Sequence, residues 1–502
     1  MRVRVVMPAL MLLALAACAT TPLRRDAFGD IGVSEAARLI RGKSLSSVEL
    51  TDVLLTRAEA SRELNAFITL DRAGAMAAAQ RADADLAVGR VKGPLHGIPL
   101  VVKDNVHVAG LPNTAGTPGL RDLVPTANAP TVQRLLDAGA IILGKTNMHE
   151  LAFGISGYNE GFFTAQPIGV RNPYDRTRIA GGSSSGTGAA IGARLAPGGL
   201  GSDTGGSVRI PAALTGGVGL RPTLGRYSQE GVTPIAHSRD TVGPMARTVT
   251  DVALLDAVIT GGSVPGPASL AGVRLGVHRG YFFADLDPDT KAVVEAALAK
   301  LVQAGVTLVD VEMPDLVKLN NAVSFPVALY EAYDDLKAYL AKYAPGKTVE
   351  SVAQAIASKD VKGTYDGLVV PRKLPAPGGG VVDGRPAYEA AMKDGRPALA
   401  RLFASTFATA RIEALLAPTT PAVAVTQGPE ASSLETFLRF IRNTDPGSNA
   451  GIPGLTIPAG LGPTTGLPVG LSLDGPRGSD VRLLSLGMAI EGVLGRTPAP
   501  RR

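Results

Sequence analysis

The sequence has one cysteine, no tryptophan and only five histidines among its 502 residues. A single cysteine excludes a disulfide framework and any zinc or iron–sulfur site built from cysteines. None of the histidines stands in a His-Glu-x-x-His arrangement, so the pattern does not favour a histidine metal site. The chain also lacks a basic tract, and 50 Lys and Arg against 44 Asp and Glu leave a formal charge of +6. So mild a charge does not favour binding to nucleic acid.

Apolar residues, by contrast, are plentiful. They make up 45% of the chain, and 60 Gly and 37 Pro are spread along it. This is enough material for a large core, which excludes wholesale disorder. At about 100 to 200 residues per domain, the length allows two or three domains or one large α/β domain.

The first residues are typical of an export signal. Arg2 and Arg4 precede an apolar run over residues 5–17. This run is shorter than the roughly 20 residues that a membrane-spanning helix needs, but it suits the apolar region of a signal peptide. The run ends in Leu15-Ala16-Ala17-Cys18, which resembles the bacterial lipobox.

We therefore expect residues 1–17 to be removed before Cys18, which would carry the lipid, with residues 18–30 as a tether. An ordinary signal peptide with a cysteine near its cleavage site is the alternative. Either signal predicts the periplasmic side of a cell envelope. Ala rather than Asp after the cysteine suggests the outer membrane of a Gram-negative cell. The lipid would be the chain's only attachment to a membrane.

Helical and extended patterns alternate along the rest of the chain. Such alternation predicts a largely parallel or mixed sheet covered by helices on both faces, within one large α/β domain. The predicted helices span residues 46–64, 72–88, 131–138 and 287–305, and the predicted strands span residues 98–103, 140–143 and 307–311. Residues 371–386, rich in Pro and Gly, predict a long surface loop, either a tolerated insertion or a lid near the site.

Two Gly/Ser clusters and one lysine carry the candidate chemistry. Taken singly, such clusters are usually turns, and a lysine at the end of a strand usually reaches for water. Lys103 ends a predicted buried strand, and small apolar residues fill the stretch between the clusters. The clusters are Gly181-Gly182-Ser183-Ser184-Ser185-Gly186-Thr187-Gly188 and Gly201-Ser202-Asp203-Thr204-Gly205-Gly206-Ser207-Val208-Arg209.

Together these residues match what an acyl-transfer enzyme needs. A serine hydroxyl is a poor nucleophile until a base takes its proton, and the oxyanion that forms needs backbone N–H donors. A Thr-Gly-Gly-Ser turn lets the backbone approach a substrate closely. A lysine serves as the base only when it is neutral, a state that burial favours by lowering its pKa.

Lys103 and the two clusters, in this order, resemble the amidase signature family. Ser183 and Ser207 have the 24-residue spacing of that family's two catalytic serines. The resemblance runs from about residue 30 to residue 495, and it implies an amidase signature catalytic domain over residues 31–497. Further matching segments are residues 97–104, 145–154, 172–173, 416–421 and 466–471.

The resemblance implies a role for each matching residue. Ser207 would attack the amide carbonyl and form an acyl-enzyme. Ser183, after a cis peptide bond from Gly182, would pass its proton to Lys103, the base. No metal or cofactor is implied. The backbone N–H groups of Thr204, Gly205, Gly206 and Ser207 would form the oxyanion hole, and Ser184, Asp203 and Arg209 would orient the network.

Some residues near these motifs do not match a catalytic position of the family. Ser185 and Thr187 depart from the commoner pattern after the bridging serine, which we expect to affect packing more than chemistry. His149 and His237 are expected to be structural.

Other enzyme classes fit less well. Residues 182–186 also match Gly-x-Ser-x-Gly, the nucleophile elbow of α/β-hydrolases, but that site needs a later acid and then a histidine, and the last histidine is His278. A β-lactamase-like Ser-x-x-Lys is absent from the sequence. A glutamine-amidotransferase subunit of the same family works in the cytoplasm with a partner chain, which the export signal argues against. A non-catalytic, ligand-binding envelope lipoprotein would have no need of Lys103, Ser183 and Ser207 together.

The substrate is predicted only as a class. Residues 328–332 and 356–363 resemble the aryl-acetamide hydrolases of the family, which act on indoleacetamide and mandelamide. They favour a small aromatic or apolar amide. Export points instead to a peptide amide, an amide antibiotic or another xenobiotic met outside the cytoplasm. A peptide amidase or an ester or xenobiotic hydrolase of the same family is therefore the alternative. We expect a monomer or a homodimer.

Overall fold

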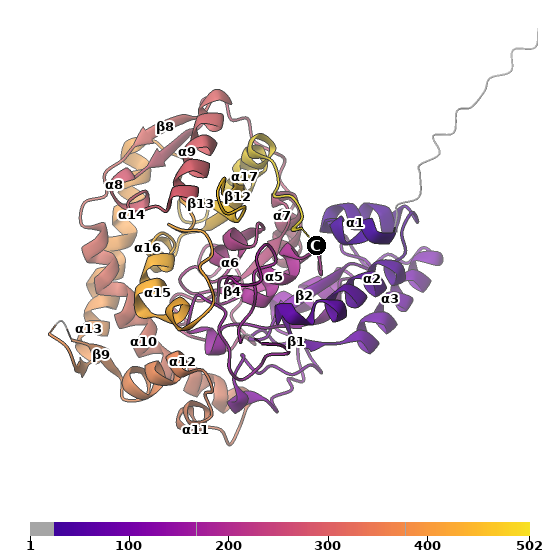
Figure 1. Ribbon diagram of the computed structural model, residues 1–502, viewed down its shortest axis with the longest axis horizontal. Coiled ribbons are helices and arrows are strands. Elements are labelled where there is room, and N and C mark those ends of the chain that lie inside the picture. Colours follow the sequence, from indigo (N-terminus) through magenta and orange to yellow (C-terminus); the bar gives the residue numbers. More distant parts are fainter. Residues whose placement is uncertain (1–24, 167, 377, 502) are drawn as a thin grey trace, which may run out of the picture.

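One large sheet runs through the computed structural model, which describes residues 25–166, 168–376 and 378–501 (Figure 1). Its strands, in chain order, are β1 Phe67–Leu70, β2 Pro99–Lys103, β3 Ile141–Thr146, β4 Gly198–Asp203, β5 Val218–Arg221, β6 Thr241–Ala246, β7 Arg274–Val277, β8 Thr307–Asp310, β11 Ala414–Pro418, β12 Gly454–Leu461 and β13 Pro468–Asp474. Their order across the sheet is β1-β3-β2-β4-β6-β5-β12-β13-β11-β7-β8. The prediction of one large α/β domain with a mixed sheet is confirmed.

Parallel pairing occurs in two separate parts of this sheet. β3, β2 and β4 are parallel neighbours near one edge, and β11, β7 and β8 are parallel at the other. The strands between these groups, from β4 through β6, β5, β12 and β13 to β11, pair antiparallel, as does β1 with β3. The sequence predicted a largely parallel or mixed sheet. In the structure the parallel pairs lie on either side of an antiparallel centre.

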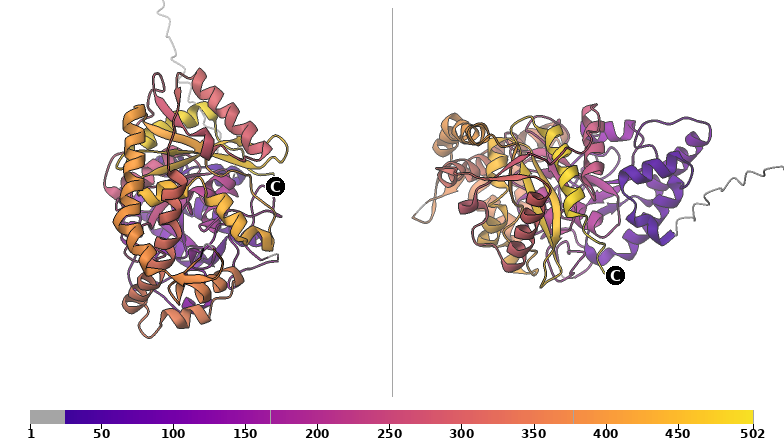
Figure 2. Two further views of the ribbon diagram at one scale, coloured as in Figure 1. Left: turned by 90° about the vertical axis from the view of Figure 1, so that its left-hand side faces the viewer. Right: turned by 90° about the horizontal axis from the view of Figure 1, so that it is seen from above.

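Helices cover both faces of the sheet. In chain order they are α1 Val33–Arg41, α2 Ser47–Ala60, α3 Arg72–Ala87, α4 Pro130–Asp137, α5 Ser185–Gly192, α6 Arg209–Leu214, α7 Val249–Thr260, α8 Arg279–Phe282, α9 Pro288–Gln303, α10 Leu316–Tyr343, α11 Val349–Gln354, α12 Lys359–Thr364, α13 Arg385–Ala390, α14 Arg396–Ala410, α15 Leu434–Ile441, α16 Asp445–Ala450 and α17 Asp480–Leu494. Figure 2 shows α1 to α3 at one end of the molecule and α10 to α14 at the other.

The centre of the sheet shows why both faces are covered. Successive side chains of a strand point to opposite faces. A Cβ at Gly470 of β13 would lie 2.5 Å from that of Ala213, so α6 packs closely on that face. Leu455 of β12 points to the opposite face of the sheet and packs against α17. A Cβ at Gly487 of α17 would lie 2.4 Å from the Leu455 side chain.

The predicted helices and strands are confirmed to within a few residues at their ends. α2 begins with a capping box in which Ser46 and Glu49 exchange hydrogen bonds between side chain and backbone. α9 has Asp287 as its N-cap, whose side chain accepts the Thr290 N–H, and Pro288 at its first position. These local signals fix where each helix starts.

The segment predicted as a surface loop, residues 371–386, is partly ordered. It contains a short antiparallel hairpin of β9 Lys373–Pro375 and β10 Val381–Asp383. Val381 and Val382 of β10 are exposed, whereas Pro375 of β9 lines the main cavity described below.

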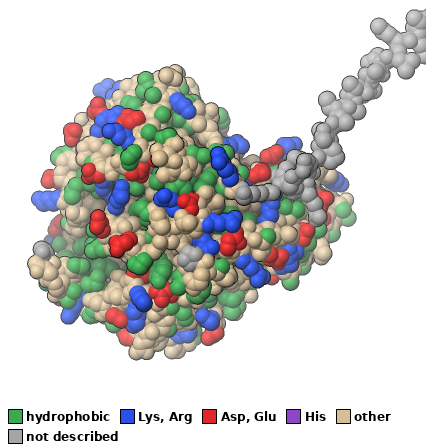
Figure 3. Space-filling model, in the orientation of Figure 1, with side chains coloured by type: hydrophobic (Ala, Val, Ile, Leu, Met, Phe, Trp, Pro, Cys, Tyr) green, Lys and Arg blue, Asp and Glu red, His purple; other side chains and the backbone are tan. Residues whose placement is uncertain are grey.

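The predicted signal peptide and Cys18 lie outside the described residues and stay predictions. In the part of the chain that the structure describes, no helix combines the length and apolar character needed to cross a membrane. Figure 3 shows acidic and basic side chains interspersed on the face in view.

Candidate active site

Two neighbouring parallel strands bring the candidate lysine and the second Gly/Ser cluster together. β2 ends at Lys103 and its parallel neighbour β4 ends at Asp203, so the carboxyl ends of both strands lie at the same edge of the sheet. Lys103 Nζ lies 2.7 Å from Ser183 Oγ and 2.8 Å from Ser202 Oγ. The sequence did not single out Ser202, although it belongs to the second cluster.

Burial changes the acid–base chemistry of Lys103. Its side chain is fully buried, and the loss of water around the ammonium lowers the pKa to about 7. The carboxylates of Asp203 and Asp240 oppose this shift because their negative charges favour the ammonium. The amine is therefore available in its neutral form near neutral pH.

The first cluster folds into a tight turn that holds Ser183 beside Lys103. The peptide bond between Gly182 and Ser183 is cis, as the resemblance implied. Ser184 then ties the turn to the second cluster. Its Oγ donates to the Ser202 carbonyl at 3.1 Å, and its N–H donates to the Ser207 carbonyl at 3.1 Å.

Ser185 and Thr187, which depart from the family pattern, take part in packing. Ser185 Oγ donates to the Ser183 carbonyl at 3.2 Å. The Thr187 hydroxyl is 2.7 Å from that of Thr146 in β3, and it also donates to the Leu200 carbonyl. Both side chains therefore tie α5 to its surroundings.

The turn before α6 presents backbone N–H groups around Ser207. The N–H of Gly206 donates to Asp203 Oδ1 at 2.8 Å, so it is engaged within the protein, in contrast to its predicted oxyanion role. The N–H groups of Thr204, Gly205 and Ser207 donate to no acceptor within residues 25–166, 168–376 and 378–501. These three are the donors free to meet a substrate oxygen.

Glycine is required at position 206 for two reasons. Its φ is +142°, and a Cβ there would lie 2.2 Å from Thr444 Oγ1. The same hydroxyl of Thr444 donates to the Gly205 carbonyl at 2.6 Å. A residue just before α16 thus clamps the turn.

A buried charge network supports this turn from behind. The Arg209 guanidinium lies 3.2 Å from Asp203 and that of Arg221 lies 3.0 Å from it. Burial alone would raise the pKa of Asp203, but the two guanidinium groups outweigh it and hold that pKa below its usual range. Asp203 and Arg209 were predicted for this role from the sequence, whereas Arg221 was not.

A second buried carboxylate contacts the side chain of Thr204. The Thr204 hydroxyl donates to Asp240 Oδ1 at 2.6 Å, and Asp240 Oδ2 accepts the N–H groups of Ile235 and Ala236. Burial raises the pKa of Asp240 to about 6 despite these hydrogen bonds. Asp240 stands in no recognisable motif and was not predicted.

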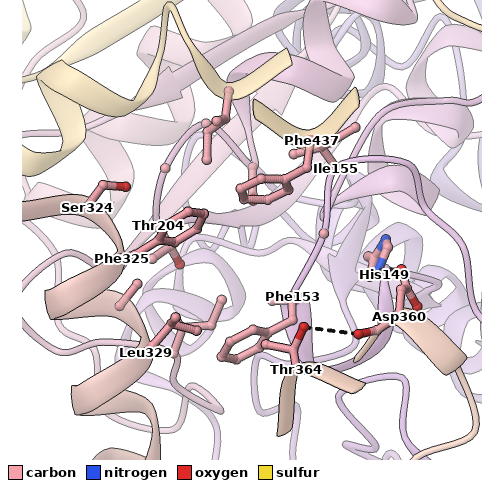
Figure 4. A pocket seen from close by; sticks show the side chains of 18 of the residues that line it. His149, Phe153, Ile155, Thr204, Ser324, Phe325, Leu329, Asp360, Thr364 and Phe437 are labelled. Carbon is pink, nitrogen blue, oxygen red and sulfur yellow. Dashed lines mark hydrogen bonds and ion pairs between the residues drawn. The ribbon is translucent and has the colours of Figure 1, made fainter. Parts of the chain in front are cut away.

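Ser207 opens onto a cavity of about 380 Å³ with a largely apolar lining. The rings of Phe325 and Phe437 stack with their centroids 6.3 Å apart and their planes 18° apart. Figure 4 shows these two rings close together on one side of the cavity, with His149 and Asp360 on another. The cavity is also lined by Phe153, Ile155, Ile235, Ala328, Leu329 and Leu368. Through Ala328, Leu329 and Asp360, both segments that resemble the aryl-acetamide hydrolases, residues 328–332 and 356–363, contribute to its lining.

The two histidines considered from the sequence have different surroundings. His149 is buried beside the cavity, with Nε2 3.0 Å from Asp360, and its backbone N–H donates to the Ser183 carbonyl at 3.2 Å. His237 is 60% exposed and does not line the cavity, and its Nδ1 lies 3.0 Å from Asp335. Neither ring is hydrogen-bonded to the side chain of Lys103, Ser183 or Ser207.

Known proteins resemble the chain along almost its full length. The sequence profile described as Amidase matches residues 49–484. The chain is 46% identical to the mandelamide hydrolase of Pseudomonas putida over 473 residues, covering 94% of this chain and 93% of that protein. It is 39% identical to the indoleacetamide hydrolase of Agrobacterium vitis over 459 residues, covering 90% of this chain and 94% of that protein.

Solved structures agree with these sequence relationships. The native peptide amidase of Stenotrophomonas maltophilia superimposes with a TM-score of 0.78 at 30% identity, covering 94% of this chain and 99% of that one. A crystal structure described as amidase gives a TM-score of 0.79 at 32% identity.

Proposed function

The chain belongs to the amidase family and hydrolyses amide bonds, and on this basis we propose that it cleaves small aromatic carboxamides through an acyl-enzyme on Ser207. The observation that carries the proposal is the contact between Lys103 and Ser183. A fully buried amine with a pKa near 7 lies 2.7 Å from a serine hydroxyl, next to the turn that holds a second serine. A lysine can act as a neutral base near neutral pH because burial excludes water and lowers its pKa.

In the first step, Ser207 Oγ attacks the carbonyl carbon of the amide. As the new C–O bond forms, the Ser207 proton passes to Ser183 Oγ and the Ser183 proton passes to the neutral Lys103 amine. The carbonyl oxygen takes the negative charge and accepts hydrogen bonds from the free N–H groups of the turn. Lys103 is then an ammonium.

In the second step, the C–N bond breaks. The proton on Lys103 returns through Ser183 to the leaving nitrogen, which departs as ammonia or an amine. The acyl group remains as an ester on Ser207. Water then attacks this ester with the same relay taking its proton, and the carboxylic acid and the free Ser207 hydroxyl are released.

Support for an aromatic acyl group comes from the cavity. Its aromatic side chains, Phe153, Phe325 and Phe437, suit a flat ring, and aromatic pairs favour stacked or edge-to-face contact. The volume of about 380 Å³ lies within the usual range for small-ligand pockets. The names of the mandelamide and indoleacetamide hydrolases also point to aryl-substituted amides.

A substrate panel with ammonia or amine release as the readout tests this proposal. We expect 2-hydroxy-2-phenylacetamide, phenylacetamide and indole-3-acetamide to be turned over with a higher kcat/KM than acetamide. A peptide amide and an aryl ester should be included because the sequence leaves both open as alternative substrates. Faster turnover of the peptide amide than of every aryl amide would contradict the proposed substrate class.

A fluorophosphonate probe tests the nucleophile separately from the substrate. Wild-type protein should be labelled, and Ser207→Ala should not. If labelling persists in Ser207→Ala and maps to another serine, that serine and not Ser207 would be the nucleophile.

We also propose, from residues 2–18 of the sequence alone, that the chain is exported and carries a lipid on Cys18. Its membrane attachment would then be the acyl chains. Cells grown with labelled palmitate should tag the wild-type protein but not Cys18→Ala. Label retained by Cys18→Ala would rule out this anchor.

A further inference from the structure

Three side chains of types that can bind a metal ion meet outside the substrate cavity. His237 belongs to the segment between β5 and β6, and Glu331 and Asp335 lie one turn apart on α10. One ligand atom from each of the three lies within 4.8 Å of the other two. The sequence did not indicate this cluster, because His237 and Asp335 are 98 residues apart in the chain.

The distances match those between the ligands of one small metal ion. His237 Nδ1 is 3.4 Å from Glu331 Oε2 and 3.0 Å from Asp335 Oδ1. In a tetrahedral zinc site each nitrogen or oxygen ligand lies about 2.0–2.2 Å from the ion, which sets neighbouring ligands about 3.3–3.6 Å apart. The two distances to His237 Nδ1 lie in or near this range, and the ligand atoms of Glu331 and Asp335 lie within 4.8 Å of each other. The three side chains are therefore close enough to share one ion once they adjust to it.

The Glu331 carboxylate is held in place by groups outside the cluster, whereas Asp335 Oδ2 accepts the backbone N–H of His237 at 2.6 Å. The Tyr388 hydroxyl donates to Glu331 Oε1 at 3.2 Å, which leaves Oε2 turned toward His237. The backbone N–H of Ser238 donates to Glu331 Oε2 at 3.1 Å. Such outer hydrogen bonds orient metal ligands and strengthen binding.

The cluster is also open on one side. Glu331 is only 2% exposed and Asp335 is half-buried, but the His237 ring is 60% exposed. Solvent can therefore supply the remaining ligands of an ion with three protein ligands, as in open zinc sites.

The charges of the cluster favour a divalent cation. Two carboxylates face one imidazole, so the cluster carries net negative charge in either protonation state of the histidine. The Arg396 guanidinium, which interacts electrostatically with Glu331, donates to the carbonyl oxygens of Ser238 and Asn449 instead of to these carboxylates. A divalent ion on two carboxylates and a neutral imidazole gives a neutral centre, which lowers the cost of the partly buried charge.

We propose that His237, Glu331 and Asp335 form a binding site for a first-row divalent metal ion, with Zn²⁺ as the ion of choice. One nitrogen and two oxygens are a donor set that Zn²⁺ accepts in proteins. The bound ion would join the segment over residues 231–240 to α10. Ile235 and Arg239 of that segment and Phe325 and Leu329 of α10 all line the substrate cavity, so the ion would brace two walls of it.

The test uses the full chain after treatment with a chelator and dialysis. We expect calorimetric titration with ZnCl₂ to give one saturable site and Zn²⁺ to raise Tm. His237→Ala and the isosteric Asp335→Asn should each lose the site and the rise in Tm. Asp334→Asn is the matched control, because Asp334 lies on the same helix but pairs with Arg372. It should bind Zn²⁺ like the wild type.

Two results would overturn the proposal. One is the absence of a saturable site in the wild-type protein. The other is Zn²⁺ binding that His237→Ala and Asp335→Asn retain with wild-type affinity, which would assign the ion to another part of the chain. Because the readouts are binding and Tm, failure here leaves the proposed amide hydrolysis untouched.

Discussion

The hydroxyl of Thr204 donates to the carboxylate of Asp240 at 2.6 Å, and this hydrogen bond links the substrate-binding turn to a charge that also acts on Lys103. Asp240 raises the pKa of Lys103 because its negative charge favours the ammonium, although burial of the lysine is the larger effect and lowers it. One carboxylate thus affects both the turn and the base.

Asp240→Asn should shift the acid limb of the pH–kcat/KM profile to lower pH. The substitution keeps an acceptor for Thr204 but removes the negative charge, so the Lys103 ammonium loses stabilisation and its pKa falls further. The measurement is kcat/KM from pH 5 to 9 for both proteins. An acid limb that moves to higher pH would show that Asp240 does not act through its charge on Lys103.

The wild-type pH profile should rise with a midpoint near the pKa of Lys103, which is about 7. Burial lowers this pKa, so the reactive neutral amine accumulates as pH rises, from about a tenth at pH 6 to about nine-tenths at pH 8. Lys103→Ala should lose several orders of magnitude in kcat and lose this limb. Near wild-type turnover by a folded Lys103→Ala protein would exclude the lysine as the base.

Ser183→Ala should also lower kcat severely, because it removes the hydroxyl between Lys103 and the nucleophile. We expect a loss of at least about a thousandfold, comparable to removal of a member of a serine-hydrolase triad. Ser185→Ala is the control, since its hydroxyl only donates to the Ser183 carbonyl. It should keep kcat within about tenfold, and an equal loss in both variants would point to a structural cause.

Asp203→Asn should destabilise the fold by about 3–5 kcal/mol, because it leaves the Arg221 guanidinium buried without its countercharge and leaves Arg209 with only Asp474, 3.7 Å away. Urea unfolding measures the effect. Asp85→Asn is the comparison, because it breaks the exposed ion pair with Arg90 and should cost at most about 1 kcal/mol. Similar losses in the two variants would mean that the Asp203 network adds no special stability.

Ala328→Trp should select against aromatic substrates. Ala328 lines the cavity beside Leu329, and an indole ring there would occupy space that the proposed acyl group needs. We expect kcat/KM for indole-3-acetamide to fall at least about tenfold, as overfilled sites resist large groups, while acetamide is affected much less. Equal losses for both amides would locate the aromatic group elsewhere.

Local sequence patterns were enough to predict the helices α2, α3, α4 and α9 and the strand that ends at Lys103. The direction of the central strands was not predictable, because a short apolar run reads the same in parallel and antiparallel pairs. β5 and β12, which pair at the centre of the sheet, are far apart in the chain. Their pairing has no local signature.

The site shows the same division between local and distant information. Lys103, Ser183 and Ser207 stand in compact motifs, and the resemblance of these motifs to a known family indicated their roles. Asp240 and Thr444 stand in no motif, and their importance comes from contacts with Thr204 and Gly205 that only the folded chain creates. The engagement of the Gly206 N–H by Asp203 was likewise invisible in the sequence.

The hydrogen bond from Thr444 to the Gly205 carbonyl has a consequence for protein synthesis. Ribosomes make the reactive lysine and both serines in the first half of the chain, but the hydroxyl that secures the turn around Gly205 arrives only after most of the translation is complete. A truncated product that stops short of α16 would carry every reactive group and lack the brace that positions the turn. Hydrolytic competence is thereby coupled to near-complete translation.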